Sequence, residues 1–199
     1  MEGPMRRLTV ALVLVMVFGA SWTAWRVSAD TSAVPPMTGI PPELVADYIH
    51  HVIEADRTAY TTHVVERMQL MGVVVAAENW RERPVLPLPA QLLLEASQMA
   101  SARQNSVRYR LMSLWPINPK NGPSNEFERH GLEAVRTAPE HPYTGIQSRP
   151  GGRYFEAVYA DRAVTQACIG CHNAHPKSPR HDFKRTDVMG GILIRIPLS

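Results

Sequence analysis

Apolar residues recur every three or four positions between residues 44 and 75, and this spacing predicts an amphipathic helix. Prolines at positions 41 and 42 suit the first turn of such a helix. A helix continuing to Trp80 would be about 55 Å long at about 1.5 Å per residue, more than a small domain can cover. We therefore expect it either to break, at Gly72 or at the Thr61-Thr62 pair, or to form a homodimer.

The rest of the chain predicts an α+β domain. A second helix is expected from Pro89 to about Gln104, and Asn125 followed by Glu128 has the form of a capping box, which starts a short helix. Alternation with a period of two predicts strands near residues 106–113, 153–160 and 191–197, whereas residues 141–152 are expected to be loop. Helices followed by strands and short helices indicate a mostly antiparallel sheet.

Composition limits the chain to one domain and gives no support for nucleic-acid binding. The 199 residues are 45% hydrophobic and 20% charged, enough for a single packed core. The formal net charge is +3, and the first 29 residues, with Glu2, Arg6, Arg7 and Arg26, supply most of it. The remainder is close to neutral, so no basic stripe for nucleic acid is expected.

The N-terminus has the pattern of a secretion signal. Arg6 and Arg7 precede the 18 uncharged residues 8–25, and Val27-Ser28-Ala29 resembles a small-x-small cleavage site. Cleavage near Ala29 would release a soluble periplasmic domain, whereas an uncleaved segment 8–25 would anchor it to the inner membrane. With residues 30–42 as a Pro-rich spacer, the expected parts are 1–29, 30–42 and 43–199.

The two cysteines of the chain both lie in Cys168-Ile169-Gly170-Cys171-His172, the pattern of c-type haem attachment. Two thiols three residues apart can each form a thioether with a haem vinyl group, and the adjacent imidazole then meets the iron. Export agrees with this reading, because c-type haem is attached after translocation. The sequence therefore predicts one covalent haem c, with His172 as the proximal ligand.

Three other uses of these cysteines compete with haem attachment. A disulfide between Cys168 and Cys171 suits an oxidising compartment but leaves His172 unexplained. A zinc site needs further ligands, and no third cysteine exists. A thioredoxin-like redox pair expects a preceding βαβ pattern, which the chain lacks.

Residues 153–197, together with residues 109–123, resemble the single-haem, c-type, PAS-like domains once catalogued as a domain of unknown function. In that family a strand leads into Cys-x-x-Cys-His and an Asp-Val-x-Gly turn starts the final strand; here Asp187-Val188-Met189-Gly190 matches that turn. The resemblance covers about residues 44–198. It implies a PAS-like α+β fold with long N-terminal helices, haem against an antiparallel sheet, and a periplasmic redox- or gas-sensing role.

The sixth iron position is left open by the sequence. Some members of that family use a cysteine near the start of the second helix, where this chain has Leu-Pro-Leu-Pro-Ala-Gln at 86–91. His63, in the first predicted helix, is the distal candidate, and water or an empty position is the alternative. Further residues with lower claims as ligands are His50, His51, Met68, Met71 and Met99.

Other candidate residues would contact the haem without binding its iron. Tyr154, Phe155 and Arg110 are the cofactor-contact candidates on predicted strands, while Tyr109 and Trp115 line either the pocket or the core. His175 is expected to form a hydrogen bond near the haem edge. Basic residues that could pair with the haem propionates are Lys177, Arg180, Lys184 and Arg185.

We predict an exported monohaem protein that senses redox state or a small diatomic ligand through its iron. The first alternative is a periplasmic electron-transfer cytochrome c, which needs a strong sixth ligand and a redox partner protein. The second is a haem enzyme acting on a small nitrogen or oxygen species, but no residue can be assigned as its acid or base. Because Ser199 directly follows the last strand, a signal is expected to leave through the N-terminal helix or a separate partner.

Overall fold

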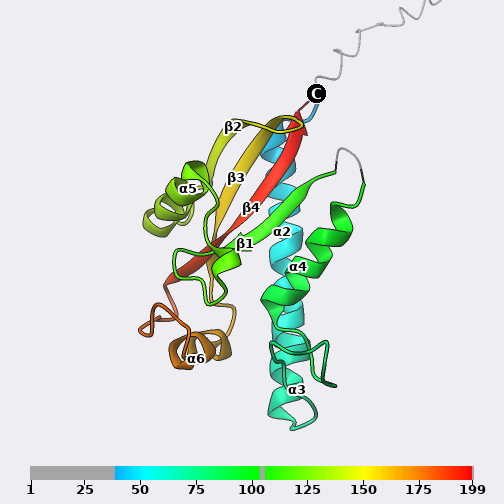
Figure 1. Ribbon diagram of the computed structural model, residues 1–199, viewed down its shortest axis with the longest axis vertical. Helices are drawn as coiled ribbons and strands as arrows, with labels where there is room; N and C mark the ends of the chain where they lie inside the picture. Colours follow the sequence, from blue (N-terminus) through cyan, green and yellow to red (C-terminus); the bar gives the residue numbers. More distant parts are fainter. Residues whose placement is uncertain (1–38, 104–105, 199) are drawn as a thin grey trace, which may run out of the picture. The chain divides into compact units, whose positions relative to one another are not determined.

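The computed structural model describes residues 39–103 and 106–198 (Figure 1). The expected signal or anchor, 1–29, and residues 30–38 of the expected spacer lie outside the described residues. The elements in chain order are α2 (Pro42–Ala59), the π-helical η1 (Tyr60–Glu66), α3 (Arg67–Leu70), α4 (Pro89–Ala100), β1 (Arg108–Met112), the 3-10 helix η2 (Pro119–Asn121), α5 (Glu126–Thr137), β2 (Tyr143–Arg149), β3 (Gly152–Arg162), α6 (Gln166–Ala174) and β4 (Val188–Leu198).

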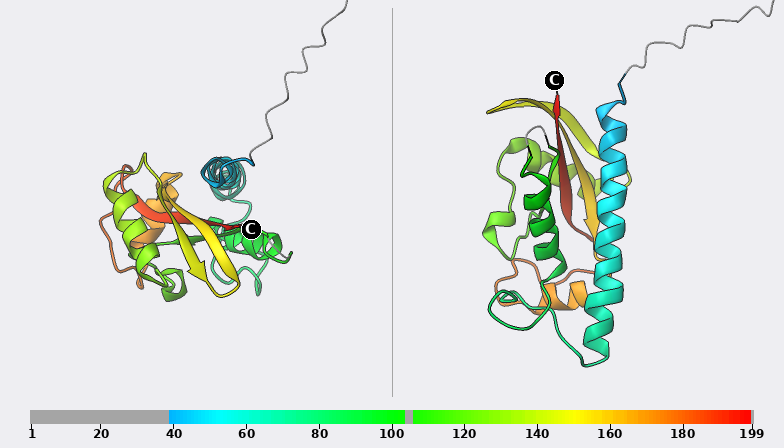
Figure 2. Two further views of the ribbon diagram at one scale, coloured as in Figure 1. Left: turned by 90° about the horizontal axis from the view of Figure 1, so that it is seen from above. Right: turned by 90° about the vertical axis from the view of Figure 1, so that its right-hand side faces the viewer.

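The first predicted helix forms, but it ends well before Trp80. Elements α2, η1 and α3 follow one another without a break (Figure 2). Gly72 terminates them with φ +67°, and its N–H donates to Gln69 while that of Val73 donates to Met68. The Thr61-Thr62 pair lies inside η1, where the Thr61 hydroxyl donates to the Arg57 carbonyl at 2.7 Å. Within the described residues, no helix has the length and apolar character needed to cross a membrane.

The four strands form one antiparallel sheet in the order β1-β4-β3-β2. This confirms the α+β class and the strands expected near 106–113, 153–160 and 191–197. On one face, α2 and α4 pack on alternate residues of β3 and β4, including Phe155, Tyr159 and Ile194. On the other face, α5 packs Leu132 and Val135 against Val158, Leu193 and Met112.

The loop predicted for residues 141–152 is wrong, because residues Tyr143–Arg149 form the edge strand β2. The alternation of apolar and polar residues is weak in β2 because an edge strand is covered on only part of one face. Tyr143 packs against Phe127 of α5, whereas Ile146, on the other face, is 54% exposed. The turn to β3 uses Gly151 and Gly152 at φ +97° and +135°, which favours glycine at both positions.

The face of the sheet that α5 covers holds a buried ion-pair network. Asn125 caps α5 by accepting from the Glu128 N–H at 3.1 Å, and the Glu128 carboxylate accepts from the N–H of Ser124 at 2.7 Å. This differs from a full capping box, in which the glutamate would reach the cap residue itself. Fully buried Glu156 accepts from Arg149 at 2.9 and 3.0 Å and from Arg195 at 2.7 Å.

Candidate functional site

Helix α6 carries all three residues of the Cys-x-x-Cys-His motif. Residues three and four apart on a helix are neighbours, so Cys168, Cys171 and His172 share one side of α6. Both thiols are free; Cys168 is half-buried and Cys171 is exposed. Ile169 anchors the helix to the domain, since it is buried together with Phe183 and Met189. The short helix thus presents two thiols and one imidazole together.

The imidazole of His172 lies partly inside the protein. Its ring meets the Phe183 ring edge-on, with 6.0 Å between the centroids, and its Nδ1 atom is buried. Burial lowers the pKa of His172, and nearby Asp161 opposes that shift. The neutral imidazole is therefore favoured, and neutral imidazole is the form that binds metals.

Asp161 and Arg57 form an ion pair between β3 and α2, close to His172. The Asp161 carboxylate accepts from both terminal nitrogens of Arg57, with 3.3 Å between Nη2 and Oδ2, and the two side chains are only 8% and 12% exposed. Burial raises the pKa of Asp161, whereas Arg57 acts in the opposite direction. The pair connects the strand that leads into α6 with the first long helix.

His50 of α2 completes this group, which we call the buried polar cluster: His50, Arg57, Asp161 and His172. The His50 ring stacks on Tyr159 with 4.0 Å between centroids, and the Tyr159 hydroxyl donates to Asp47 at 2.7 Å. Burial lowers the pKa of His50, and the carboxylates of Glu54, Asp47 and, most weakly, Asp161 oppose this shift.

Three polar atoms of the buried polar cluster have no partner. Among the described residues, the buried side-chain nitrogens and oxygens without a hydrogen bond are His50 Nε2, Arg57 Nε and His172 Nδ1. Buried polar groups in native proteins are nearly always hydrogen-bonded, so an unpaired one calls for an explanation. Two of the three, Arg57 Nε and His172 Nδ1, belong to side chains that lie near Asp161 beside α6.

Residues 76–91 lie against the other end of α6. Leu86 pairs with Val75 and Ala77 through backbone hydrogen bonds of 2.9 and 3.0 Å. Glu78 Oε1 lies 3.4 Å from His175 Nε2 at the end of α6. The pKa of Cys171 is raised first by burial and then by the negative charge of Glu78. The 86–91 stretch, where the resembling family carries a distal cysteine in some members, contacts this segment through Gln91, which donates to the Glu78 carbonyl at 2.8 Å, but it offers no thiol.

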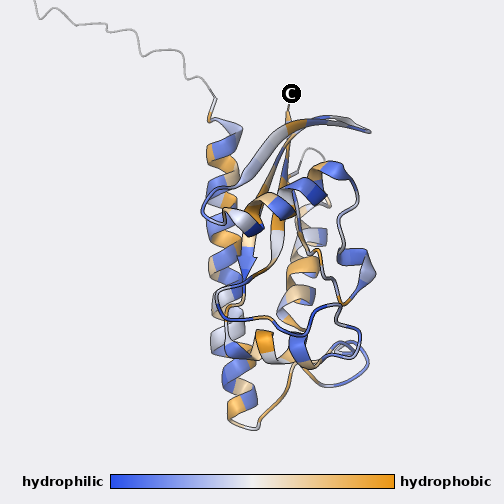
Figure 3. Cartoon of the chain, turned by 90° about the vertical axis from the view of Figure 1, so that its left-hand side faces the viewer, coloured by the Kyte–Doolittle hydropathy of each residue, from blue (hydrophilic) through white to orange (hydrophobic). Residues whose placement is uncertain are grey.

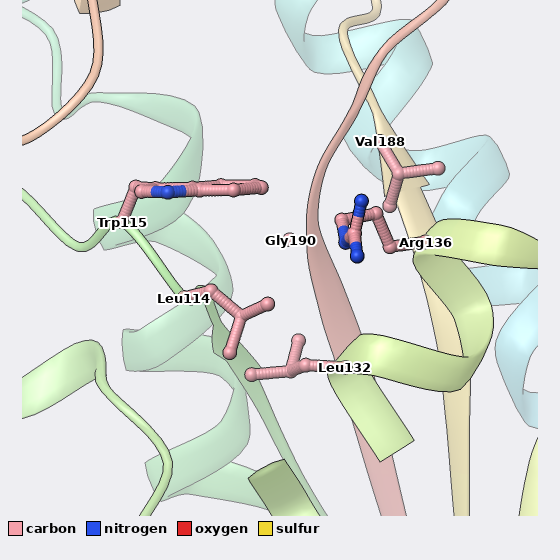
Figure 4. Close-up of a pocket in the computed structure, with 6 residues that line it drawn as sticks. All are labelled: Leu114, Trp115, Leu132, Arg136, Val188 and Gly190. Atoms are coloured by element: carbon pink, nitrogen blue, oxygen red, sulfur yellow. The ribbon is translucent and has the colours of Figure 1, made fainter. Parts of the chain in front are cut away.

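A small pocket lies between α5, the start of β4 and the segment that follows β1. This pocket, shown in Figure 4, has a volume of only about 10 Å³ and is lined by residues that include Trp115, Arg136 and Gly190. That is space for about one water molecule. Trp115 also packs against the group formed by Ile169, Phe183 and Met189.

The structure does not bring His63 into the buried polar cluster. His63 is exposed on η1, whereas its neighbours Thr61 and Val65 are the buried residues of that segment. Of the other candidate ligands, His50 is buried and Met68 is half-buried. The remaining three, His51, Met71 and Met99, are exposed.

Tyr154, Phe155 and Arg110 also lie apart from α6. Phe155 is buried in the core beneath α2, about 20 Å before Asp161 along β3 at about 3.3 Å per residue. Tyr154 is at the same distant end of the strand, and Arg110 binds the Ser124 hydroxyl at 2.9 Å near the start of α5. They serve the sheet and the α5 face rather than the motif.

Among the basic residues after the motif, Arg180 is held by the protein itself. It pairs with Asp182 and Asp187 at 2.6 Å and lies over the rings of Trp115 and Phe183 at 4.9 and 4.4 Å. Lys177, Lys184 and Arg185 are exposed.

Sequence reasoning missed Asp161 and Arg57. The signal available was a second carboxylate, after Glu156, in a mostly apolar strand, since buried carboxylates are rare without a cation. Its partner lies 104 residues earlier in the chain, and only the fold reveals it. Within the described residues, no group of three or more His, Cys, Asp or Glu residues is placed to hold a metal ion directly.

Comparison with known proteins gives one family and one structure. The model of the Tll0287-like family matches residues 43–197. The crystal structure described as "the cyanobacterial heme-protein Tll0287" is similar with 16% identity and a TM-score of 0.46, covering 80% of this chain and 98% of that one. No curated protein matches the chain. Since the family match spans most of its length, the chain belongs to the Tll0287-like family.

Proposed function

We propose that this protein binds one haem at α6, with Cys168 and Cys171 as covalent attachments and His172 as the proximal iron ligand. The observation that carries the proposal is that two free thiols and an imidazole share one side of a short helix beside unpaired buried polar atoms. Family membership supports it, because the protein that gives the family its name is described as a heme-protein.

The residues at α6 fit the group. Each thiol would add its sulfur and its proton across one haem vinyl double bond, which needs no disulfide partner. His172 is kept neutral by burial and can therefore donate its lone pair to iron. Arg57 Nε and His50 Nε2 are the buried polar atoms left to meet the bound group, and an arginine suits a propionate carboxylate. When bound, haem supplies an iron centre that changes oxidation state and takes small axial ligands.

A sensing role, for redox state or a small diatomic ligand, is the activity that this arrangement supports best. Asp161 connects the strand before α6 to Arg57, and the π-helical segment η1 begins three residues after Arg57. π-helical turns occur often at functional sites and are less regular than the α-helix around them. The ion pair gives a change at α6 a direct route to the long helix. We also propose a PAS-like fold, for which the antiparallel sheet flanked by helices is the support.

Optical spectra and hydrogen exchange test this role. We expect the ferrous protein to bind carbon monoxide, and amide exchange in residues 50–66 to change between the ferric, ferrous and carbon monoxide forms. In the Asp161→Asn variant, which removes the ion pair and keeps the residues proposed to contact haem, the spectral response to carbon monoxide should remain while the exchange response is lost. A low-spin spectrum unaffected by carbon monoxide, with identical exchange in all forms, would contradict sensing and favour electron transfer.

Export to the periplasm and self-association through α2 complete the proposal. Residues 1–29 supply the export signal, cleaved or retained as an anchor. Leu44, Tyr48 and Val52 lie four residues apart on α2 and are 39%, 57% and 61% exposed; Figure 3 shows hydrophobic residues recurring along this helix. A second copy of the chain would cover that stripe, and Tyr48→Glu should convert a dimer to a monomer in sedimentation experiments.

A further inference from the structure

A pocket lies at the end of the sheet farthest from α6. It has a volume of about 280 Å³, and its lining includes Arg103, Ser106, Arg108, Arg153 and Tyr154. Arg153 and Tyr154 stand at the start of β3, whereas α6 follows the end of that strand, about 30 Å further on at about 3.3 Å per residue. The pocket is therefore separate from the proposed haem site.

Its three arginines lack the carboxylate partners that other arginines of the sheet have. Arg149 and Arg195, on the same sheet, are paired with buried Glu156. Across residues 39–103 and 106–198, no ion pair involves Arg103, Arg108 or Arg153, and no Asp or Glu lines the pocket. Like charges gathered in one hollow repel each other, and a bound anion removes that repulsion.

Neutral hydrogen-bond donors stand beside these charges. The Tyr154 hydroxyl lies next to Gly151, where an added Cβ would come within 3.1 Å of it, and Ser106 contributes a second hydroxyl to the lining. Arginine forks with hydroxyl donors match the several acceptor oxygens of a tetrahedral phosphate group. A pocket of this size suits a headgroup-sized ligand rather than a large cofactor.

We propose that this pocket binds a phosphate group, held by Arg103, Arg108 and Arg153. The phosphate belongs either to a small soluble anion or to an anionic phospholipid headgroup, which present the same oxygens.

The direction of α2 bears on the choice between these sources. Asp47 contacts Tyr159 and Arg57 contacts Asp161, so α2 and β3 run in the same direction and begin at the same end. Figure 2 shows the start of α2 and the β2–β3 turn at that end. The described chain therefore begins at the end of the domain that holds the pocket, and a membrane anchor in the residues before it would favour the phospholipid headgroup.

The test uses the full chain, with Arg108→Gln/Arg153→Gln as the pocket variant and Arg67→Gln/Arg83→Gln as the control. All four arginines are exposed, so both variants lose the same charge without disturbing the core. Tyr154→Phe removes one hydroxyl and serves as a milder second variant.

One arm of the test titrates inorganic phosphate into each variant by calorimetry at constant ionic strength. The other compares flotation with phosphatidylglycerol and phosphatidylcholine vesicles, so that insertion of the N-terminus is common to both.

Two results support the proposal and distinguish the sources. Saturable phosphate binding at one site, weakened about tenfold or more in the pocket variant alone, supports a soluble anion. The headgroup is supported by a different pair of results. Inorganic phosphate then gives no binding in calorimetry, and the excess binding to phosphatidylglycerol is lost in the pocket variant but kept in the control. Equal behaviour of the pocket and control variants in both arms, or no preference for phosphate in either arm, would overturn the proposal.

Discussion

Arg57 of α2 and Asp161 of β3 form a buried ion pair that connects the long N-terminal helix to the strand leading into α6. Removing one partner leaves the other as an uncompensated buried charge. We therefore expect Arg57→Met and Asp161→Asn each to lower the free energy of unfolding by about 3–5 kcal/mol. The double variant should lose less than the sum, because it contains neither charge. Denaturant unfolding of the haem-loaded protein measures all three; single losses below about 1 kcal/mol would mean that the pair is solvated.

The buried hydroxyl of Tyr159 should make the folded protein less stable at alkaline pH. Burial first, and then its hydrogen bond to Asp47, raise the pKa of Tyr159. The folded protein thus holds the phenol proton more tightly than the unfolded chain does. Its contribution is complete below the ordinary tyrosine pKa of about 10 and falls as the pH rises above it. The Tyr159→Phe variant should show a smaller alkaline decline in unfolding free energy than the wild-type chain, whereas parallel declines would contradict this assignment.

Two glycines should respond in opposite directions to alanine. A Cβ at Gly190 would clash with the Met112 carbonyl oxygen of the neighbouring strand, whereas a Cβ at Gly170 in α6 meets nothing within 4 Å. Gly190→Ala is expected to destabilise the protein by about 1–3 kcal/mol. Gly170→Ala should stabilise it by about 0.5–1 kcal/mol through helix propensity and leave Cys168, Cys171 and His172 in place. Thermal unfolding of both variants is the measurement, and similar shifts for the two would be inconsistent with the packing described.

How much of the fold can be predicted from the sequence depends on whether the residues that determine an element lie close together in the chain. The helix end at Gly72 and the start of α5 at Asn125 were predictable, because a left-handed glycine and a side-chain cap act within a few residues. The edge strand β2 was not, since only one of its faces is partly covered and its pattern is mostly polar.

The candidate site divides in the same way. Cys168, Cys171 and His172 are adjacent in the chain, so their spacing alone indicated the chemistry. The pairing of Arg57 with Asp161 depends on the register of α2 against β3, which no short motif encodes. Arg110 and Tyr154 are residue types that could contact a haem, but strand alternation places them on the α5 side of the sheet.

His50 and His63 lead to opposite expectations for the haem spectrum. His50 is buried, with an unpaired Nε2 in the buried polar cluster, whereas His63 is exposed on η1. We expect His50→Ala to shift the ferric and ferrous spectra, and His63→Ala to leave them unchanged. The reverse result would place His63 at the iron, and would require η1 to turn that side chain inward when haem is bound.

The most direct test of the account is the intact mass of the denatured chain after expression with a cytochrome c maturation system. Wild-type protein should carry the added mass of one haem, and Cys168→Ser/Cys171→Ser should carry none. His172→Ala serves as the control, because any of this variant that matures should keep the covalent mass while its optical spectrum changes. A wild-type chain that releases its haem on denaturation, or whose mass never includes one, would contradict covalent haem attachment at α6.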